Sequence, residues 1–242
     1  MKRWLILNPN TTAAVTERLR AHAAALLGEG VTLHTATAAF GARYIADEAS
    51  FAVAGHAALD AYARHCSANG EPDAVLLGCF GDPGVAALRE ISRRTVVGLA
   101  EAAMRQAAAR GRYAIVTGGA NWGPMLERLA RALGLAEALA GIHLVAPTGA
   151  QLAADPAMAR AVLGAACRGA ALRADTVILG GAGLAGLAAL LQAEVPVPLI
   201  DSVSAGVEAL RSDPGAFLAA THAAAAAADW QGLSAPLHAR MG

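Results

Sequence analysis

Cys79 is the residue of this sequence whose type and setting best suit chemistry. It follows an apolar run, Ala74–Leu77, in the turn Gly78-Cys79-Phe80-Gly81-Asp82-Pro83-Gly84. The turn is predicted to open a helix that Asp82 caps, with Pro83 at the first helical position. Because a helix N-terminus lowers the pKa of a nearby thiol, Cys79 is expected to act as an acid or a base. The alternative is a buried cysteine that only packs as a small apolar side chain.

A second polar segment, Asn8-Pro9-Asn10-Thr11-Thr12, follows the apolar run Trp4–Leu7. Asn and Thr are favoured at helix N-caps, so this segment is consistent with a simple cap. The same residue types, together with exposed backbone N–H groups, also bind a carboxylate or carbonyl oxygen. Local sequence leaves both interpretations open.

The other cysteines and the histidines predict no further site. Cys66 and Cys167 continue apolar stripes of predicted helices, so we expect both to pack in the core. Three cysteines without metal-type spacing indicate neither a disulfide framework nor a zinc site. The seven histidines form no metal-binding pattern. We therefore expect no metal.

Gly181-Ala182-Gly183-Leu184-Ala185-Gly186 matches the G-x-G-x-x-G fingerprint of dinucleotide-binding proteins, and Asp201 ends the next predicted strand. That fingerprint normally opens a nucleotide-binding unit, whereas only one further strand is predicted here. A nicotinamide- or flavin-dependent oxidoreductase stays as an alternative, and the expected enzyme needs no cofactor.

The elements that must position these residues alternate between short apolar runs and amphipathic segments, which is typical of β-α-β units. Predicted strands are Trp4–Leu7, Val31–Thr35, Ala74–Leu77, Val96–Gly98, Tyr113–Val116, His143–Ala146, Thr176–Leu179 and Val197–Ile200. Predicted helices are Thr11–Leu27, Glu48–Cys66, one after the Cys79 turn, Pro124–Leu133, Pro156–Ala170 and Leu184–Gln192. The tail from about Ser202, including Ala223–Ala228, is expected to be helical and to pack on the first half.

An internal repeat relates two halves of the chain. A shift of 102 residues aligns Asp73–Leu88 with Asp175–Leu190, and nine of these 16 positions are identical, three of them glycines. The repeat predicts an α/β fold with two similar, doubly wound (flavodoxin-like) parallel-sheet halves related by a pseudo-two-fold axis. We expect residues 1–98 plus 202–242 in the first half and 99–201 in the second. Since ligands of open parallel sheets bind beyond the carboxyl ends of the strands, we expect an active-site cleft between the halves.

Composition narrows the class of partner. The 242 residues are 56% hydrophobic and 16% charged, with a formal net charge of zero. Zero net charge without a long basic cluster argues against nucleic acid and anionic membranes as partners. We expect a cytoplasmic protein that binds a small molecule and forms a homo-oligomer.

Three stretches resemble the aspartate/glutamate/hydantoin racemase superfamily, and within it the hydantoin racemase branch. They are Ile6-Leu7-Asn8-Pro9-Asn10-Thr11-Thr12, the Gly78–Gly84 turn and Gly98-Leu99-Ala100-Glu101-Ala102. The resemblance implies cofactor-independent racemisation at an acidic carbon of a hydantoin, amino acid or related small carboxylate or cyclic amide. Two cysteines, one from each half, would move the proton, and Cys79 matches the first. The residues that the resemblance places around the substrate are Asn8, Asn10, Thr11, Phe80, Thr117, Gly118 and Ala182.

Gly181 stands where the family's second cysteine would follow Gly180. Glycine has no side chain to exchange a proton, so two-thiol racemisation as usually drawn is not available. One alternative is a one-thiol decarboxylase, lyase or isomerase that resembles arylmalonate decarboxylase. Another is a binding protein that has lost catalysis. A water, or a side chain from elsewhere such as Tyr44, is a further candidate for the place opposite Cys79.

Overall fold

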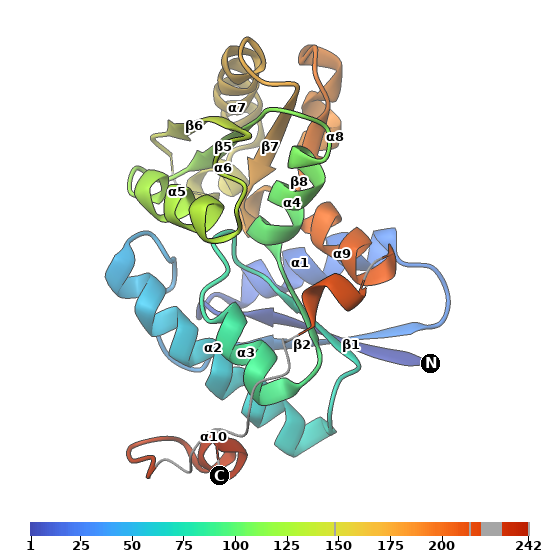
Figure 1. Ribbon diagram of the computed structural model, residues 1–242, viewed down its shortest axis with the longest axis vertical. Helices are drawn as coiled ribbons and strands as arrows, with labels where there is room; N and C mark the ends of the chain where they lie inside the picture. Colours follow the sequence, from blue (N-terminus) through green and yellow to red (C-terminus); the bar gives the residue numbers. More distant parts are fainter. Residues whose placement is uncertain (148, 213, 219–228, 242) are drawn as a thin grey trace.

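The predicted strands form two parallel four-stranded sheets, stacked along the long axis of the molecule (Figure 1). The computed structural model describes residues 1–147, 149–212, 214–218 and 229–241. The first sheet has the order β2-β1-β3-β4, with β1 Lys2–Asn8, β2 Val31–Thr37, β3 Ala74–Leu77 and β4 Thr95–Gly98. The second has the order β6-β5-β7-β8, with β5 Tyr113–Gly118, β6 Leu139–Val145, β7 Thr176–Gly180 and β8 Leu199–Asp201. The equal strand order confirms the predicted α/β fold of two similar halves.

Helices connect the strands of both sheets. They are α1 Ala13–Leu26, α2 Glu48–Asn69, α3 Val85–Ser92, α4 Leu99–Ala108, α5 Trp122–Ala132, α6 Gly149–Ala154, α7 Pro156–Ala171, α8 Leu187–Leu191, α9 Ser202–Ser212 and α10 Ala235–Met241. Short 3₁₀ turns are η1 Ala182–Leu184, η2 Gln192–Glu194 and η3 Pro214–Phe217. The continuous helix predicted over Leu184–Gln192 is wrong, because Gly186 adopts a left-handed φ of +87° and starts α8 anew.

Asp82 does not cap α3, which corrects the prediction made for the Cys79 turn. Helix α3 begins at Val85, after Gly84 with a φ of +78°. Asp82 itself has a φ of +59°, in the left-handed region that non-glycine residues seldom adopt. Its carboxylate accepts hydrogen bonds from the N–H groups of Ala100 and Glu101, at 3.0 and 2.7 Å, and so caps α4.

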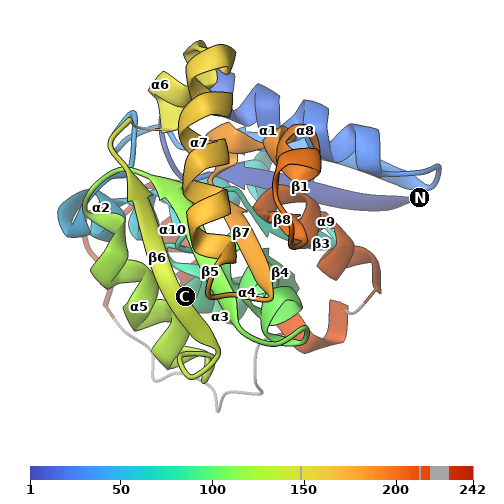
Figure 2. The same cartoon turned by 90° about the horizontal axis from the view of Figure 1, so that it is seen from above.

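The central strands of each sheet are buried on both faces, as is usual in parallel sheets, whereas the edge strands β2 and β6 are only partly buried. Leu5 and Leu7 pack towards α2 and α3, whereas Trp4 and Ile6 share a core with residues of the second sheet such as Ile115. Helix α7 covers the opposite face of β5 and β7 (Figure 2), where Cys167 is fully buried as predicted. One apolar core therefore joins the inner faces of the two halves.

The C-terminal helices pack on earlier parts of the chain. Helix α9 contacts α1 and α4, and α10 contacts α2. The Ser234 hydroxyl donates to Asp60, and Arg240 pairs with Glu71 and lies 4.9 Å from the ring centre of Tyr62. Ala223–Ala228, predicted as helix, lies outside the described residues. The proposed division into 1–98 plus 202–242 and 99–201 assigns one sheet to each part.

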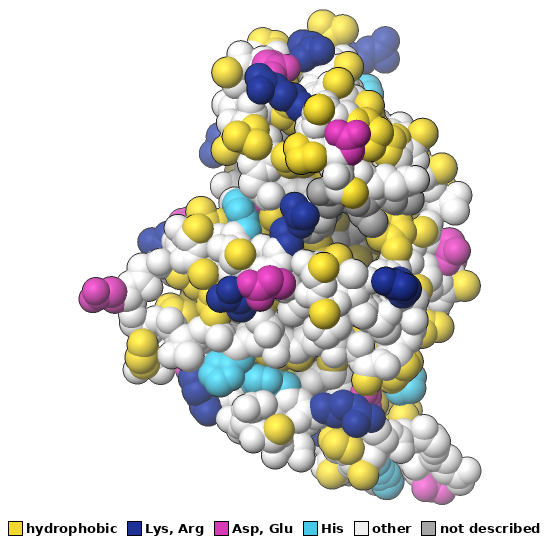
Figure 3. All heavy atoms as spheres, turned by 180° about the vertical axis from the view of Figure 1, so that it is seen from behind, with side chains coloured by type: hydrophobic (Ala, Val, Ile, Leu, Met, Phe, Trp, Pro, Cys, Tyr) yellow, Lys and Arg dark blue, Asp and Glu magenta, His cyan; other side chains and the backbone are white. Residues whose placement is uncertain are grey.

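Surface charge, helix length and the grouping of polar side chains indicate which kinds of partner the described residues could bind. Basic and acidic side chains of the described residues are interspersed on the face shown in Figure 3. Within the described ranges, no helix combines the length and the apolar character needed to cross a membrane. The same residues contain no group of three His, Cys, Asp or Glu side chains that could hold a metal ion.

Candidate active site

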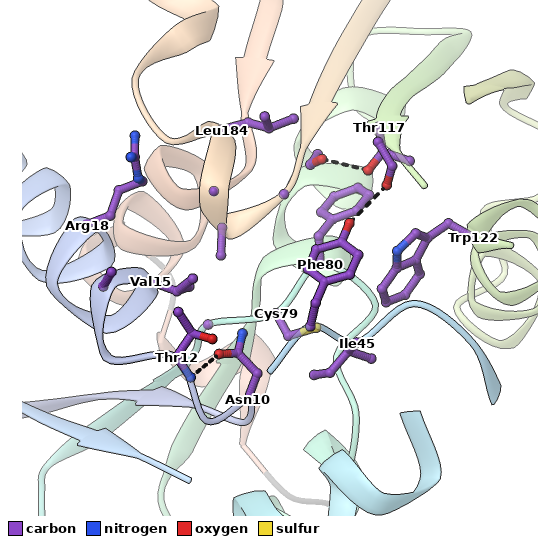
Figure 4. A pocket seen from close by; sticks show the side chains of 18 of the residues that line it. Asn10, Thr12, Val15, Arg18, Ile45, Cys79, Phe80, Thr117, Trp122 and Leu184 are labelled. Carbon is purple, nitrogen blue, oxygen red and sulfur yellow. Dashed lines mark hydrogen bonds between the residues drawn. The ribbon is translucent and has the colours of Figure 1, made fainter. Parts of the chain in front are cut away.

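A cavity of about 280 Å³ lies where the carboxyl ends of both sheets face each other. Cys79 follows β3 of the first sheet, and Gly181 follows β7 of the second. The predicted site residues among its lining are Asn10, Cys79, Phe80, Thr117, Gly118, Gly181 and Ala182 (Figure 4). The fold thus brings together residues from four strand ends that are far apart in the sequence.

Asn8 and Thr11 do not line this cavity. Asn8 is fully buried below it, and its amide donates to Asn10 Oδ1 at 3.0 Å, to the Thr12 carbonyl at 3.2 Å and to Thr16 Oγ1 at 3.0 Å. The Thr11 N–H donates to the Ala42 carbonyl at 3.1 Å. Both residues instead support the loop that carries Asn10.

Asn10 presents its amide nitrogen to the cavity. Its Oδ1 is occupied by the Thr12 N–H at 2.9 Å and by Asn8. No described residue accepts from its Nδ2, which leaves two N–H donors for a ligand oxygen. Thr12 stands at the N-cap of α1 without a side-chain cap, because its hydroxyl donates to the Arg43 carbonyl at 2.7 Å. The Thr12 side chain therefore does not cap α1, and oxygen binding by this segment stays a prediction.

Cys79 has a different electrostatic setting from the one expected. The residue is 7% exposed. Burial raises the pKa of the Cys79 thiol well above its usual range, and the negative charge of Asp82 raises it further. The predicted lowering of this pKa is wrong, because burial and the Asp82 charge both raise it. Helix α3 begins only at Val85, beyond two left-handed residues.

Aromatic side chains close the cavity where the two halves meet. The Phe80 ring lies against Gly180, where a Cβ would overlap it. Trp122 covers Gly81 in the same manner, and its ring centre lies 6.5 Å from that of Phe51. Glycine is therefore required at both turns for the halves to approach this closely.

The second half contributes a hydroxyl and a glycine whose backbone conformation disfavours other residues. Thr117 Oγ1 donates to the Gly180 carbonyl at 2.8 Å and so fixes the end of β7. The Tyr44 hydroxyl, from the first half, donates to the Gly118 carbonyl at 3.2 Å. Gly181 has a φ of +144°, and a Cβ there would lie 3.3 Å from Leu184 Cγ. The position facing Cys79 in the repeat is thus built on a backbone that suits glycine.

Several lining residues were not predicted. The main ones are Val15, Arg18, Ile45, Trp122 and Leu184 (Figure 4). Arg18 is the only charged side chain among the lining residues, and it forms no hydrogen bond or ion pair with another described residue. The sequence could have indicated Arg18, because it lies one turn beyond Ala14 and Val15 on a helix that starts at a predicted strand end. Ile45 lies in a loop without periodicity, so no pattern pointed to it.

Comparisons with known proteins agree with this geometry. Hydantoin racemase from Paenarthrobacter aurescens is 31% identical over 213 residues, which cover 87% of this chain and 90% of the relative. The structure of allantoin racemase from Klebsiella pneumoniae superimposes with a TM-score of 0.85 at 28% identity, covering 96% of this chain and 97% of that one. Arylmalonate decarboxylase shares the fold, with a TM-score of 0.60 at 18% identity over 88% of this chain and 92% of that one.

The family model for Asp/Glu/hydantoin racemases matches residues 5–210, which include every strand end around the cavity and both sheets apart from the first three residues of β1. This chain belongs to the Asp/Glu/hydantoin racemase family.

Proposed function

We propose that this protein is a cofactor-independent enzyme that moves a proton at the carbon alpha to a carbonyl group of a cyclic amide such as a hydantoin, or of a related small carboxylate. Cys79 serves as its acid and base. The observation that carries the proposal is the position of this thiol, in a cavity between two sheets of a racemase-family fold. A relative in sequence is named as hydantoin racemase, and a solved structure with this fold as allantoin racemase.

Hydrogen-bond donors around the cavity support stabilisation of an enolate. Asn10 Nδ2 has no partner among the described residues. The same holds for the backbone N–H groups of Phe80 and Ala182, which directly follow Cys79 and Gly181 in the two repeats. Donors aimed at a carbonyl oxygen stabilise the negative charge that develops there when the neighbouring carbon loses a proton or a carboxylate. These three residues are the proposed oxyanion-binding groups.

Gly181 limits the proton transfers that protein thiols can perform. Cys79 can exchange a proton with one face of the carbon only, so water or the hydroxyl of Tyr44, which also lines the cavity, would supply or accept the proton on the other face. This favours a second candidate, a decarboxylase. Loss of carbon dioxide from a disubstituted malonate generates the enolate without a base, and one thiol then protonates it.

Arg18 and the apolar lining residues indicate the class of substrate that the cavity would bind. Val15, Ile45 and Leu184 offer an apolar surface, and Arg18 adds one positive charge at the side of α1. A guanidinium group binds carboxylates through paired N–H donors. The proposed substrate therefore combines an apolar substituent with an anionic group or a polarised carbonyl.

Polarimetry tests the proposal. Wild-type protein is incubated with single enantiomers of 5-benzylhydantoin and 5-(2-carboxyethyl)hydantoin, and the optical rotation is followed. We expect enzyme-dependent loss of rotation for at least one of them, and none with Cys79→Ala. Carbon dioxide release from a disubstituted malonate, without racemisation, would favour the decarboxylase.

Ligand binding without turnover would argue against any enzymatic function. If no substrate turns over while a hydantoin raises the melting temperature of wild type and Cys79→Ala alike, the protein is a binding protein. A melting temperature raised by a nicotinamide cofactor would instead revive the oxidoreductase alternative.

A further inference from the structure

Asp82 is a buried acid that the proposed reaction does not use directly. It is 4% exposed and lies three residues after Cys79. Its N–H donates to the Cys79 carbonyl at 3.2 Å, and its own carbonyl accepts from the Val85 N–H at 3.2 Å. The residue therefore closes the tight turn that carries the thiol.

The Asp82 carboxylate is fixed from the other side by α4. It accepts from two successive N–H groups, those of Ala100 and Glu101. At Gly98, a Cβ would overlap this carboxyl group, so only glycine allows the approach. Two segments that the sequence shows as separate motifs, the Gly78–Gly84 turn and Gly98–Ala102, thus form one structural unit. Asp82 has an unusual φ of +59° at the place where its carboxylate contacts α4.

The charges around Asp82 are themselves tightly paired. Glu101 is 3% exposed and binds Arg89 at 2.7 Å and Arg105 at 2.9 Å. Burial raises the pKa of Asp82 to about 7, against the opposing effect of its two N–H donors. Arg89 lowers this pKa and Glu101 raises it. On the cavity side, the titratable or charged residues that share the lining with Cys79 are Arg18 and Tyr44.

We propose that Asp82 is a positioning residue that controls the acid–base state of Cys79: it fastens the thiol-bearing turn to the N-terminus of α4 and holds its carboxyl group in the same closed turn as the sulfur. This inference rests on the proposed function for its meaning in catalysis. A thiol next to a carboxylate keeps its proton to higher pH. Cys79 therefore rests as a proton donor, which suits the protonation of an enolate on its one accessible face.

The pH profile of alkylation by iodoacetamide tests this without a substrate. The Cys79 thiol loses its proton to solvent, and the thiolate then displaces iodide to form a sulfur–carbon bond. The rate follows the thiolate fraction, and mass spectrometry of the Cys79 peptide separates it from Cys66 and Cys167. In Asp82→Asn we expect Cys79 to react about tenfold faster at pH 8, with the profile shifted by about one pH unit to lower pH. Asn tolerates left-handed backbone and is a good N-cap, so it is the mildest uncharged replacement.

Glu101→Gln is the matched control. It also removes one buried negative charge near α4, whereas the pKa of Cys79 is raised by burial and by Asp82. We expect its Cys79 profile to match the wild type even if its stability falls. If Asp82→Asn does not fold, as judged by circular dichroism, Asp82→Ser keeps a capping oxygen and takes its place.

An unshifted profile in a folded Asp82 variant, or an equal shift in Glu101→Gln, would overturn the proposal. Neither result would contradict the proposed function, which depends on turnover by wild type and its loss in Cys79→Ala. Conversely, absence of any turnover would leave the alkylation result standing.

Discussion

At the scale of single residues, Cys79 and Gly181 occupy equivalent places but have different chemistry. Ligands of parallel sheets bind beyond the carboxyl ends of the strands, and this rule was sufficient to predict that Cys79, Phe80, Asn10 and Thr117 are neighbours. The rule depends only on where the buried strands end. The acid–base setting of Cys79 could not be predicted, because it depends on a left-handed turn and on burial by the second half.

Restoring a thiol at position 181 is expected to strain the backbone. The φ of +144° disfavours any side chain, so Gly181→Cys should lower the free energy of unfolding by about 1–3 kcal/mol. Gly181→Ala serves as the control and should lose a similar amount. Urea denaturation compares the two with the wild type. Wild-type stability in Gly181→Cys would mean that the loop adapts to a second cysteine.

At the scale of elements, the contact between the Cys79 turn and α4 organises the first half of the site. Helix α4 was not predicted, since it follows β4 directly at Leu99 without any turn residues. Its capping residue lies 18 positions earlier than Ala100, beyond the reach of local capping rules. The approximate positions of the eight strands were predicted because a buried parallel strand is a short apolar run.

A side chain at position 98 is expected to break the contact between the Cys79 turn and α4. In Gly98→Ala the added methyl group would overlap the Asp82 carboxyl group, so α4 should lose its cap and the free energy of unfolding should fall by about 1–3 kcal/mol. Gly169→Ala is the control, because nothing lies within 4 Å of its Cβ position in α7. That variant should be as stable as wild type or slightly more so. Equal thermal stability of the two variants would argue against the contact.

At the scale of the whole molecule, we expect apolar packing between the halves to contribute more to stability than surface charge. The repeat predicted two similar halves and a cleft, but not the common core that Ile6, Ile115 and α9 share. Periodicity marks which residues are buried, and not which of two sheets covers them. The shared core explains why the thiol and the groups facing it can be held at fixed separation.

Two variants compare these contributions at the junction of the halves. Trp122 is 5% exposed and packs on the Cys79 turn, so Trp122→Ala should lower the free energy of unfolding by about 3–5 kcal/mol. The exposed pair between Arg128 and Glu48, at 2.5 Å, also joins the halves. Solvent screens such a pair, so Glu48→Gln should leave the unfolding transition unchanged within error. A larger loss in Glu48→Gln than in Trp122→Ala would reverse this assignment.

Deuterium exchange at the alpha carbon tests the role of Cys79 most directly. Single enantiomers of a hydantoin that wild type turns over are incubated in D₂O with wild-type protein or Cys79→Ala, and NMR follows loss of the alpha-proton signal. Because only one face has a thiol, we expect deuterium to enter one enantiomer faster than its optical rotation is lost, and no enzyme-dependent exchange in Cys79→Ala. Exchange at an equal rate in Cys79→Ala would contradict the assignment of Cys79 as the acid and base.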